Sequence, residues 1–234
     1  MKRFLVKERL EQGAIVKLDA EESRHAAKSL RLEAGQEVLI TDGRGREAQG
    51  EVISAGPAAV EVRLGEIRES GKTVRLELLQ SVLKGPKMDW LVEKATELGV
   101  SAIYPAQSER TVASGDRKDR WLRIAESAVK QSGNLNLPEI HDLRPLASAM
   151  ALPEGAVGLM LQPGAGKGLA DWIREKKGST RFVLAIGPEG GFTETEEEAL
   201  LAAGYLPAAL SRQILRGETA GVAALAIAAH AIDF

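Results

Sequence analysis

The stretch Leu184-Ala185-Ile186-Gly187-Pro188-Glu189-Gly190-Gly191-Phe192 decides the fold of the second part of this chain. The apolar run 182–186 predicts a buried strand, and the glycine-rich segment after it predicts a loop. Thr193 can cap the helix that follows, with Glu196 at the spacing of a capping box. A strand, a glycine loop and a helix N-terminus in succession are typical of α/β proteins that bind small ligands at the carboxyl ends of their strands.

The composition restricts the class of protein. A length of 234 residues is enough for one large domain or two small ones, and 44% hydrophobic with 27% charged residues fits a packed core under a soluble surface. The absence of cysteine excludes disulfides, thiolate catalysis and cysteine-ligated metals. His25, His141 and His230 stand far apart in the sequence, so no histidine pair predicts a metal site.

A cytosolic protein without a metal is therefore the simplest interpretation. The first six residues are too short and too charged a stretch for a secretion signal. The longest apolar run, 220–229, is shorter than the roughly 20 residues that a membrane helix needs, and it predicts a buried helix.

The net charge of −2 gives no general sign of nucleic-acid binding, but the charges are unevenly distributed. Residues 1–31 hold eight lysines and arginines against five acidic residues, and residues 110–130 hold six against three. Acidic residues gather in 194–198, where they suit the first turn of a helix and predict a solvated helix face.

The first part of the chain alternates in the manner of short strands. We expect strands at 14–18, 37–41, 47–54 and 59–64, with turns between them that include Asp42-Gly43-Arg44-Gly45. One helix interrupts them: Asp19 caps it, Glu22 closes a capping box, and it runs to about Leu32. Several short strands with one helix predict a small β-barrel.

The segment 69–73 has the composition of a linker, so we expect one domain over 1–70 and a second over 73–234. In the second part, strands and helices alternate, which predicts an α/β domain with a mainly parallel sheet. Strands are expected at 74–83, 100–104, 157–161, 182–186 and 208–210, and helices at 89–98, 119–132, 195–203 and 219–232. Glycine-bearing loops at 162–166, 187–191 and 211–217 each follow a strand and would together line one pocket.

Each motif also has a simpler structural interpretation. The segment 187–191 lacks the G-K-[ST] ending of a phosphate-binding loop, and in isolation it is an ordinary tight turn. The stretch 210–220 can be a core helix with a charged cap. Lys84-Gly85-Pro86-Lys87-Met88-Asp89 places two lysines near a helix start, where they either hold phosphate or lie in a solvated turn. His25 faces either an anionic ligand or solvent.

Taken in order, these pieces resemble one family over nearly the whole chain. They are His25 with Ser29-Leu30-Arg31, Asp42-Gly43, Lys84-Gly85-Pro86-Lys87-Met88, the segment 94–100, Ser108-Glu109-Arg110, and the segments 126–140, 186–192 and 214–220. The chain resembles the RsmE-type 16S ribosomal RNA (uracil-N3)-methyltransferases of the knotted SPOUT superfamily. The family usually has arginine at the positions of Asn134 and Gln213, and threonine at the position of Gly217. These three differences from the family bear on RNA affinity or reaction rate more than on the fold.

The resemblance implies a PUA-like β-barrel that helps to bind RNA, followed by an α/β domain with a deep trefoil knot. It also implies a homodimer, S-adenosylmethionine as methyl donor, and 16S rRNA of the small ribosomal subunit as partner. The residues it implies for the cofactor are Leu161, Gln162, Gly187, Pro188, Glu189, Gly190, Gly191, Leu210, Ser211, Ile214, Leu215, Thr219 and Ala220.

The implied reaction assigns catalytic and RNA-binding roles. Arg216 is the candidate that stabilises the uracil anion, and Glu218 acts either as the base or, as we favour, by orienting Arg216. Basic side chains that hold phosphates set the register of the RNA. The candidates for this are Lys2, Arg3, Arg24, His25, Lys28, Arg31, Lys84, Lys87, Arg110 and Lys130.

Other functions stay open at this point. An RNA-binding protein without catalysis would share the two-part architecture. A nucleotide-dependent enzyme is less well supported, because the lysine-bearing phosphate loop is missing. A related knotted methyltransferase that acts on tRNA or on a ribose 2′-hydroxyl is the closest competitor.

Overall fold

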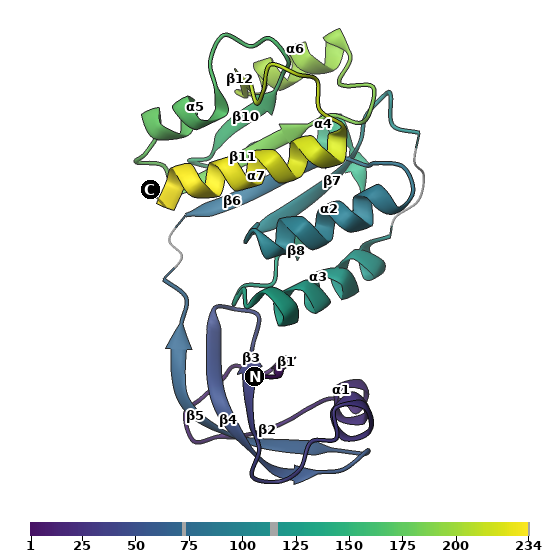
Figure 1. Ribbon diagram of the computed structural model, residues 1–234. Helices are drawn as coiled ribbons and strands as arrows, with labels where there is room; N and C mark the ends of the chain where they lie inside the picture. The colour runs from purple at the N-terminus through teal and green to yellow at the C-terminus, as the bar shows by residue number, and fades with distance from the viewer. Residues whose placement is uncertain (72–73, 113–116, 234) are drawn as a thin grey trace. The chain divides into compact units, whose positions relative to one another are not determined.

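The computed structural model describes residues 1–71, 74–112 and 117–233 (Figure 1). They form two compact units: 1–71 with 129–137, and the described residues of 72–128 with those of 138–234. Of the expected linker 69–73, Glu69 ends a strand and Lys72 and Thr73 lie outside the described residues.

The first unit is a curled five-stranded sheet. Its elements are β1 (Arg3–Leu5), β2 (Ile15–Lys17), α1 (Ala20–Arg24), the π-helical turn η1 (His25–Ser29), β3 (Glu37–Thr41), β4 (Arg46–Ala55) and β5 (Val60–Glu69). The strands pair in the order β1-β3-β4-β5-β2, and all pairs except β1 with β3 are antiparallel. One core of buried aliphatic side chains, including Val38, Ile40 and Val62, lies inside the curl, as the small barrel predicted from the sequence requires.

The helix of this unit differs from the prediction. The α-helix ends at Arg24, and the chain continues as a π-helical turn. In this turn, Leu30 N–H donates to the His25 carbonyl at 3.0 Å. Asp19 caps the backbone N–H groups of Glu21 and Glu22 as expected, but the Glu22 carboxylate pairs with Lys130. Glu22 therefore anchors the segment Val129–Leu137 to this unit, a contact that local sequence spacing does not show.

The second unit is an α/β domain. Its elements are β6 (Arg75–Ser81), α2 (Pro86–Glu97), β7 (Ala102–Gln107), α3 (Lys118–Ser132), β8 (Glu139–Ile140), β9 (Arg144–Pro145), α4 (Leu146–Ala149), β10 (Val157–Leu161), α5 (Leu169–Glu175), β11 (Arg181–Ile186), α6 (Glu194–Ala202), β12 (Leu206–Ala208) and α7 (Gly217–Asp233). The last residues of α3 belong to the first unit. The strands run in the order β12-β10-β11-β6-β7-β8, with β9 also paired to β7. Every one of these pairings is parallel, which confirms the expected parallel sheet.

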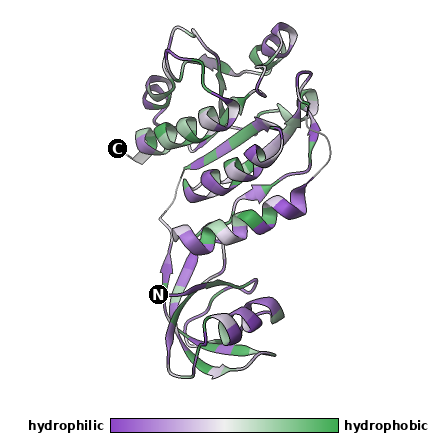
Figure 2. Cartoon of the chain, turned by 45° about the vertical axis from the view of Figure 1, so that its right-hand side comes forward, coloured by the Kyte–Doolittle hydropathy of each residue, from purple (hydrophilic) through white to green (hydrophobic). Residues whose placement is uncertain are grey.

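Helices cover both faces of this sheet. Helix α7, which is hydrophobic along most of its length (Figure 2), packs on β6 and β11 and against α2 and α5. On the other face, Leu146 of α4 and Leu200 of α6 join Leu79 and Val183 in a second core cluster. Within the described ranges, no helix is long and apolar enough to cross a membrane.

Two expectations for this unit were wrong in detail. The strand expected at 208–210 lies at Leu206–Ala208 and contains Pro207, which an edge strand such as β12 tolerates because one side of its backbone is unpaired. Helices α4 and α5 were not predicted, because four and seven residues are too few to establish a helical period.

A buried carboxylate ties the central strands together near their amino ends. Glu77 of β6 is fully buried and accepts from Arg75 Nε at 2.8 Å and from Arg181 Nη2 of β11 at 2.9 Å. The Tyr104 hydroxyl of β7 donates to Glu77 Oε2 at 3.0 Å. This network joins three neighbouring strands at the end of the sheet opposite the glycine loop.

Glu77→Ala removes the buried carboxylate that Arg181 and the Tyr104 hydroxyl share, while Arg75 keeps its pair with Glu139. Because Arg181 loses its buried counter-charge, the free energy of unfolding is expected to fall by about 3 kcal/mol. Urea denaturation measures this value, with Glu154→Ala as the control because Glu154 is exposed in the same unit. If Glu77→Ala lowers the free energy of unfolding no more than the control does, the network does not stabilise the pairing of these strands.

Candidate functional site

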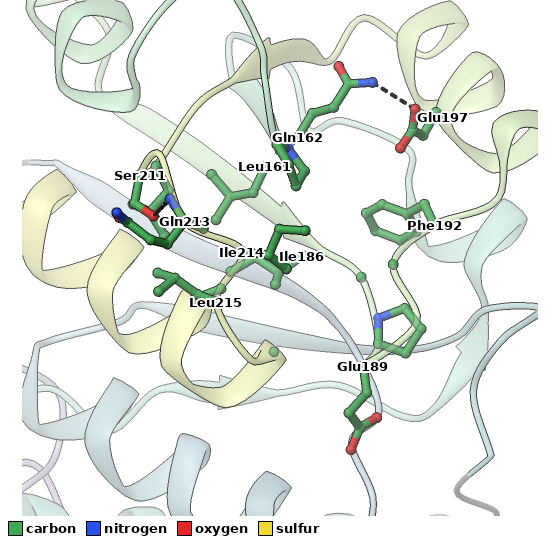
Figure 3. A pocket seen from close by; sticks show the side chains of 17 residues that line it. Leu161, Gln162, Ile186, Glu189, Phe192, Glu197, Ser211, Gln213, Ile214 and Leu215 are labelled. Carbon is green, nitrogen blue, oxygen red and sulfur yellow. Dashed lines mark hydrogen bonds between the residues drawn. The ribbon is translucent and has the colours of Figure 1, made fainter.

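The loops that follow β10, β11 and β12 line one pocket at the carboxyl ends of these strands (Figure 3). This is the convergence of glycine-bearing loops that the sequence predicts. The pocket is lined by Leu161, Gln162, Pro163, Ile186, Gly187, Pro188, Glu189, Gly191, Phe192, Glu197, Leu210, Ser211, Gln213, Ile214, Leu215, Gly217 and Ala220.

Most of the residues proposed for the cofactor line this pocket, but Gly190 and Thr219 do not. Pro163, Gln213 and Gly217 belong to loops that the sequence places at the pocket, although they were not among the residues proposed for the cofactor. Ile186, Phe192 and Glu197 lie outside those loops and were not selected. Phe192 could have been selected as the apolar end of the glycine loop. Glu197 was not selected because it lies in the acidic run 194–198, which the sequence predicts to be a solvated helix face.

The glycine loop after β11 needs glycine for steric reasons. A Cβ atom at Gly187 would lie 2.9 Å from the backbone nitrogen of Phe192 and 3.1 Å from the carbonyl carbon of Gly191. Gly191 has a φ of 71°, a conformation that side-chain-bearing residues rarely adopt. The chain can therefore turn back on itself within five residues and place Phe192 against the pocket.

The last loop passes close to the ends of two central strands. A Cβ atom at Gly217 would lie 2.7 Å from Leu83 Cδ2, just beyond β6, and 3.5 Å from the Gly187 carbonyl oxygen, just beyond β11. Glycine permits this approach, and α7 begins at the same residue. The close approach joins the last loop and the glycine loop into one wall of the pocket.

The pocket combines apolar walls with acidic groups. Leu161, Ile186 and Leu215 supply apolar surface, and Ile214 is 86% exposed at the pocket. Gln162 Nε2 donates to Glu197 Oε2 at 2.7 Å, the dashed line in Figure 3. Among the described lining residues there is no lysine or arginine, so Glu197 places negative charge in the pocket wall.

Lys87 of α2 connects the glycine loop to α7. Its Nζ lies 3.0 Å from Glu189 Oε1 and 3.8 Å from Glu218 Oε2, and the Lys84 backbone N–H also donates to Glu189 at 3.3 Å. Burial opposes the charged form of Glu189, but hydrogen bonds from Lys87 and from backbone N–H groups outweigh it and hold the Glu189 pKa below its ordinary value. Glu189 is therefore an ionised anchor of the loop at neutral pH.

The two residues expected to be catalytic lie beside the pocket. Arg216 is exposed, and neither Arg216 nor Glu218 belongs to the lining residues. Glu218 Oε2 is buried, and the ion-pair partner found for it among the described residues is Lys87. Among the interactions of the described residues, none joins Glu218 directly to Arg216.

The residues expected to bind RNA fall into two groups. Four of them are exposed in the first unit, on the end of α1, on η1 and on the turn after it: Arg24, His25, Lys28 and Arg31. The other predicted basic residues in that unit have partners there: Arg3 pairs with Glu47, Lys130 with Glu22, and Lys2 Nζ donates to the Leu30 carbonyl.

In the second unit, Lys84 is exposed, whereas Lys87 and Arg110 contact the glycine loop. These contacts occupy hydrogen-bond donors, so fewer donors are left for RNA phosphates on Arg3, Lys87, Arg110 and Lys130.

Comparison with known proteins gives the family. A model of the RNA methyltransferase domain matches residues 70–229, and a model of the RNA methyltransferase PUA domain matches residues 18–65. The chain belongs to the ribosomal RNA small subunit methyltransferase E family. It is 32% identical to the member of that name from Mycobacterium bovis, over 91% of this chain and 85% of that protein.

Solved structures support the same assignment. The crystal structure of ribosomal RNA small subunit methyltransferase E from Neisseria gonorrhoeae bound to S-adenosyl methionine is 31% identical, with a TM-score of 0.89 over 97% of this chain and 95% of that one. A Legionella pneumophila protein in complex with the same cofactor is 28% identical, with a TM-score of 0.85 over 97% and 96%. Membership in this methyltransferase E family confirms the expected fold class, a PUA-like domain followed by an α/β methyltransferase domain.

The depressed pKa of Glu189 gives a pH-dependent prediction. A carboxyl group with a lowered pKa in the folded state stabilises the protein above the ordinary pKa of 4.5 and loses that effect as pH falls through the folded value. Glu189→Gln should therefore lower the free energy of unfolding at pH 7, by up to about 1 kcal/mol because Glu189 is partly exposed. Wild type and variant should converge in urea titrations as the pH falls through the folded-state pKa, which lies below 4.5. A difference that is constant with pH would contradict the ion pair.

Proposed function

We propose that the chain transfers the methyl group of S-adenosylmethionine to N3 of a uridine in 16S ribosomal RNA. The observation that carries this proposal is the pocket that three strand-end loops form together in a chain of this methyltransferase family. The Neisseria gonorrhoeae relative, similar over 97% of this chain, binds S-adenosyl methionine.

The pocket residues fit such a cofactor. Apolar walls at Leu161, Ile186 and Leu215 suit an adenine ring, and the glycine loop exposes backbone groups to it. The Glu197 carboxylate, held by Gln162, accepts hydrogen bonds and suits the hydroxyl groups of a ribose. Its negative charge also favours a cationic sulfonium compound over a neutral one. When bound, the cofactor supplies an electrophilic methyl group.

The residues of the chain then have to prepare the uracil. The N3 proton must pass to solvent water before N3 can accept a methyl group, and the negative charge that develops on the uracil spreads onto O2 and O4. Arg216 is exposed beside the pocket, where a guanidinium can stabilise that charge. We assign Glu218 the role of fixing the first turn of α7 through Lys87, which positions Arg216. Alignment of N3 with the methyl carbon supplies a further part of the rate enhancement.

We assign RNA binding to residues 1–70 and catalysis to residues 73–234. The exposed basic side chains Arg24, His25, Lys28 and Arg31 support the first assignment, since basic groups hold phosphates. Because the family acts on small-subunit rRNA, we place the protein in the cytoplasm during ribosome assembly. We also propose a homodimer, on the resemblance to the knotted methyltransferases.

Methyl transfer from radiolabelled S-adenosylmethionine to purified small subunits or 16S rRNA tests this function. Mass spectrometry of the digested RNA should find 3-methyluridine. Methylation of a ribose 2′-hydroxyl or of tRNA would replace the substrate assignment. Cofactor binding without transfer to any RNA would overturn the proposed catalysis, and no heat on titration with the cofactor would indicate a binding protein only.

Arg216→Ala should abolish methyl transfer and leave the Kd for S-adenosylmethionine within about tenfold of wild type, because Arg216 acts on the uracil and not on the cofactor. Single-turnover transfer assays and calorimetry measure the two effects. Arg212→Ala, another exposed arginine of the same loop, is the control. Transfer by the Arg216 variant near the wild-type rate would exclude Arg216 as a catalytic residue.

Glu197→Gln should raise the Kd for S-adenosylmethionine about tenfold, because the amide loses the charge and one acceptor. Glu198→Gln is the matched control, since Glu198 is the exposed neighbour on the same helix. S-adenosylhomocysteine keeps the ribose but lacks the sulfonium charge. If the variant binds both compounds more weakly by the same factor, Glu197 contacts the ribose. If only S-adenosylmethionine binds more weakly, Glu197 recognises the sulfonium charge. If the affinity for both compounds is unchanged, Glu197 has no role in cofactor binding.

A further inference from the structure

Arg110, in the segment that follows β7, contacts the cofactor pocket's glycine loop directly. Its Nη1 donates to the Gly190 carbonyl at 2.8 Å and to the Phe192 carbonyl at 3.2 Å. The aliphatic part of the side chain packs on Gly190, where a Cβ atom would lie 3.3 Å from Arg110 Cδ. One guanidinium nitrogen thus binds two carbonyl groups on either side of Gly191.

The neighbouring residue holds the element that follows the loop. Glu109 N–H donates to Glu196 Oε1 at 2.7 Å, while Glu196 Oε2 accepts from Thr193 N–H at 2.9 Å in the capping box of α6. Two consecutive residues, Glu109 and Arg110, therefore hold both the glycine loop and the first turn of α6. That turn carries Glu197 of the pocket.

The loop needs such support from outside. Three of its five residues are glycine, which loses more backbone entropy on ordering than any other residue. The internal backbone bond found for the loop in the described chain runs from Gly191 N–H to the Pro188 carbonyl at 2.9 Å. A loop that is already ordered binds its ligand more tightly, because the cost of ordering is not taken from the binding free energy.

We propose that Arg110 is a positioning residue for the cofactor: it holds the segment Gly187–Phe192 in its binding conformation and does not serve as a contact to RNA phosphate. The inference rests on the proposed function, since it takes S-adenosylmethionine as the ligand of the pocket. It replaces the RNA-binding role expected for Arg110 from the sequence, because Arg110 Nη1 already binds two backbone carbonyls. Arg110 is exposed, so RNA binding by the rest of the guanidinium is measured separately.

The test compares cofactor binding and RNA binding in separate experiments. Arg110→Lys keeps the charge but loses the shape of the guanidinium, so the Kd for S-adenosylmethionine, measured without RNA, should rise five- to twentyfold. The Kd for 16S rRNA, measured without cofactor, should stay within twofold. Arg174→Lys is the control, because Arg174 is an exposed arginine paired within its own helix.

A second variant reaches the same contact from the other side. Gly190→Ala brings a Cβ atom within 3.3 Å of Arg110 Cδ, so the Arg110 side chain has to shift by a few tenths of an ångström. We expect weaker cofactor binding from this shift, and the double variant should be no weaker than the worse single variant. In the free protein, amide hydrogen exchange of residues 190–193 should be faster in both variants than in wild type. This readout needs no ligand.

Two results would overturn the inference. One is an unchanged cofactor Kd with weakened RNA binding in Arg110→Lys, which would return Arg110 to the phosphate contacts. The other is unchanged exchange of residues 190–193 in the variants, which would show that the contact does not order the loop. If wild type failed to bind S-adenosylmethionine, the proposed function would fall, and the exchange measurement would still decide whether Arg110 holds the loop.

Discussion

The parallel register of β10, β11 and β6 is the constraint on which the rest of the second unit depends. Ile186 at the end of β11 lies opposite Gln80 of β6, and Ala185 lies opposite Met160 of β10. Because parallel strands in this register end at one edge of the sheet, the loops that follow them are brought together without any contact of their own. The Glu77 network fixes β6 and β11, with β7 beside them, near their amino ends.

The strand register brings the loops together but does not fix their conformation. Polar side chains from neighbouring elements hold the glycine loop in its conformation. Lys87 binds Glu189, Arg110 binds the carbonyls of Gly190 and Phe192, and Glu109 binds the capping residue Glu196. Each anchor follows β6 or β7, strands that do not themselves line the pocket. The elements beside the pocket therefore order its glycine loop, and the loop is left free to present backbone groups to a ligand.

The sequence predicted what depends on neighbours in the chain. The strand, loop and capping box from 182 to 196 are local features, and the structure contains all three. The partners of Glu22, Glu197 and Arg110 lie 35 to 108 residues away, so spacing carried no sign of them. The π-helical turn after Arg24 was missed, and the edge strand with Pro207 was predicted two residues too late, at 208–210, because tertiary packing decides both.

The most direct test of this account is a crystal structure of the protein with S-adenosylmethionine. The account predicts that the cofactor lies in the pocket and touches residues of all three loops, those after β10, β11 and β12, with the glycine loop still bound to Arg110. A cofactor that binds elsewhere, or that contacts only one of the loops, would contradict the claim that the common edge of the parallel sheet builds the site.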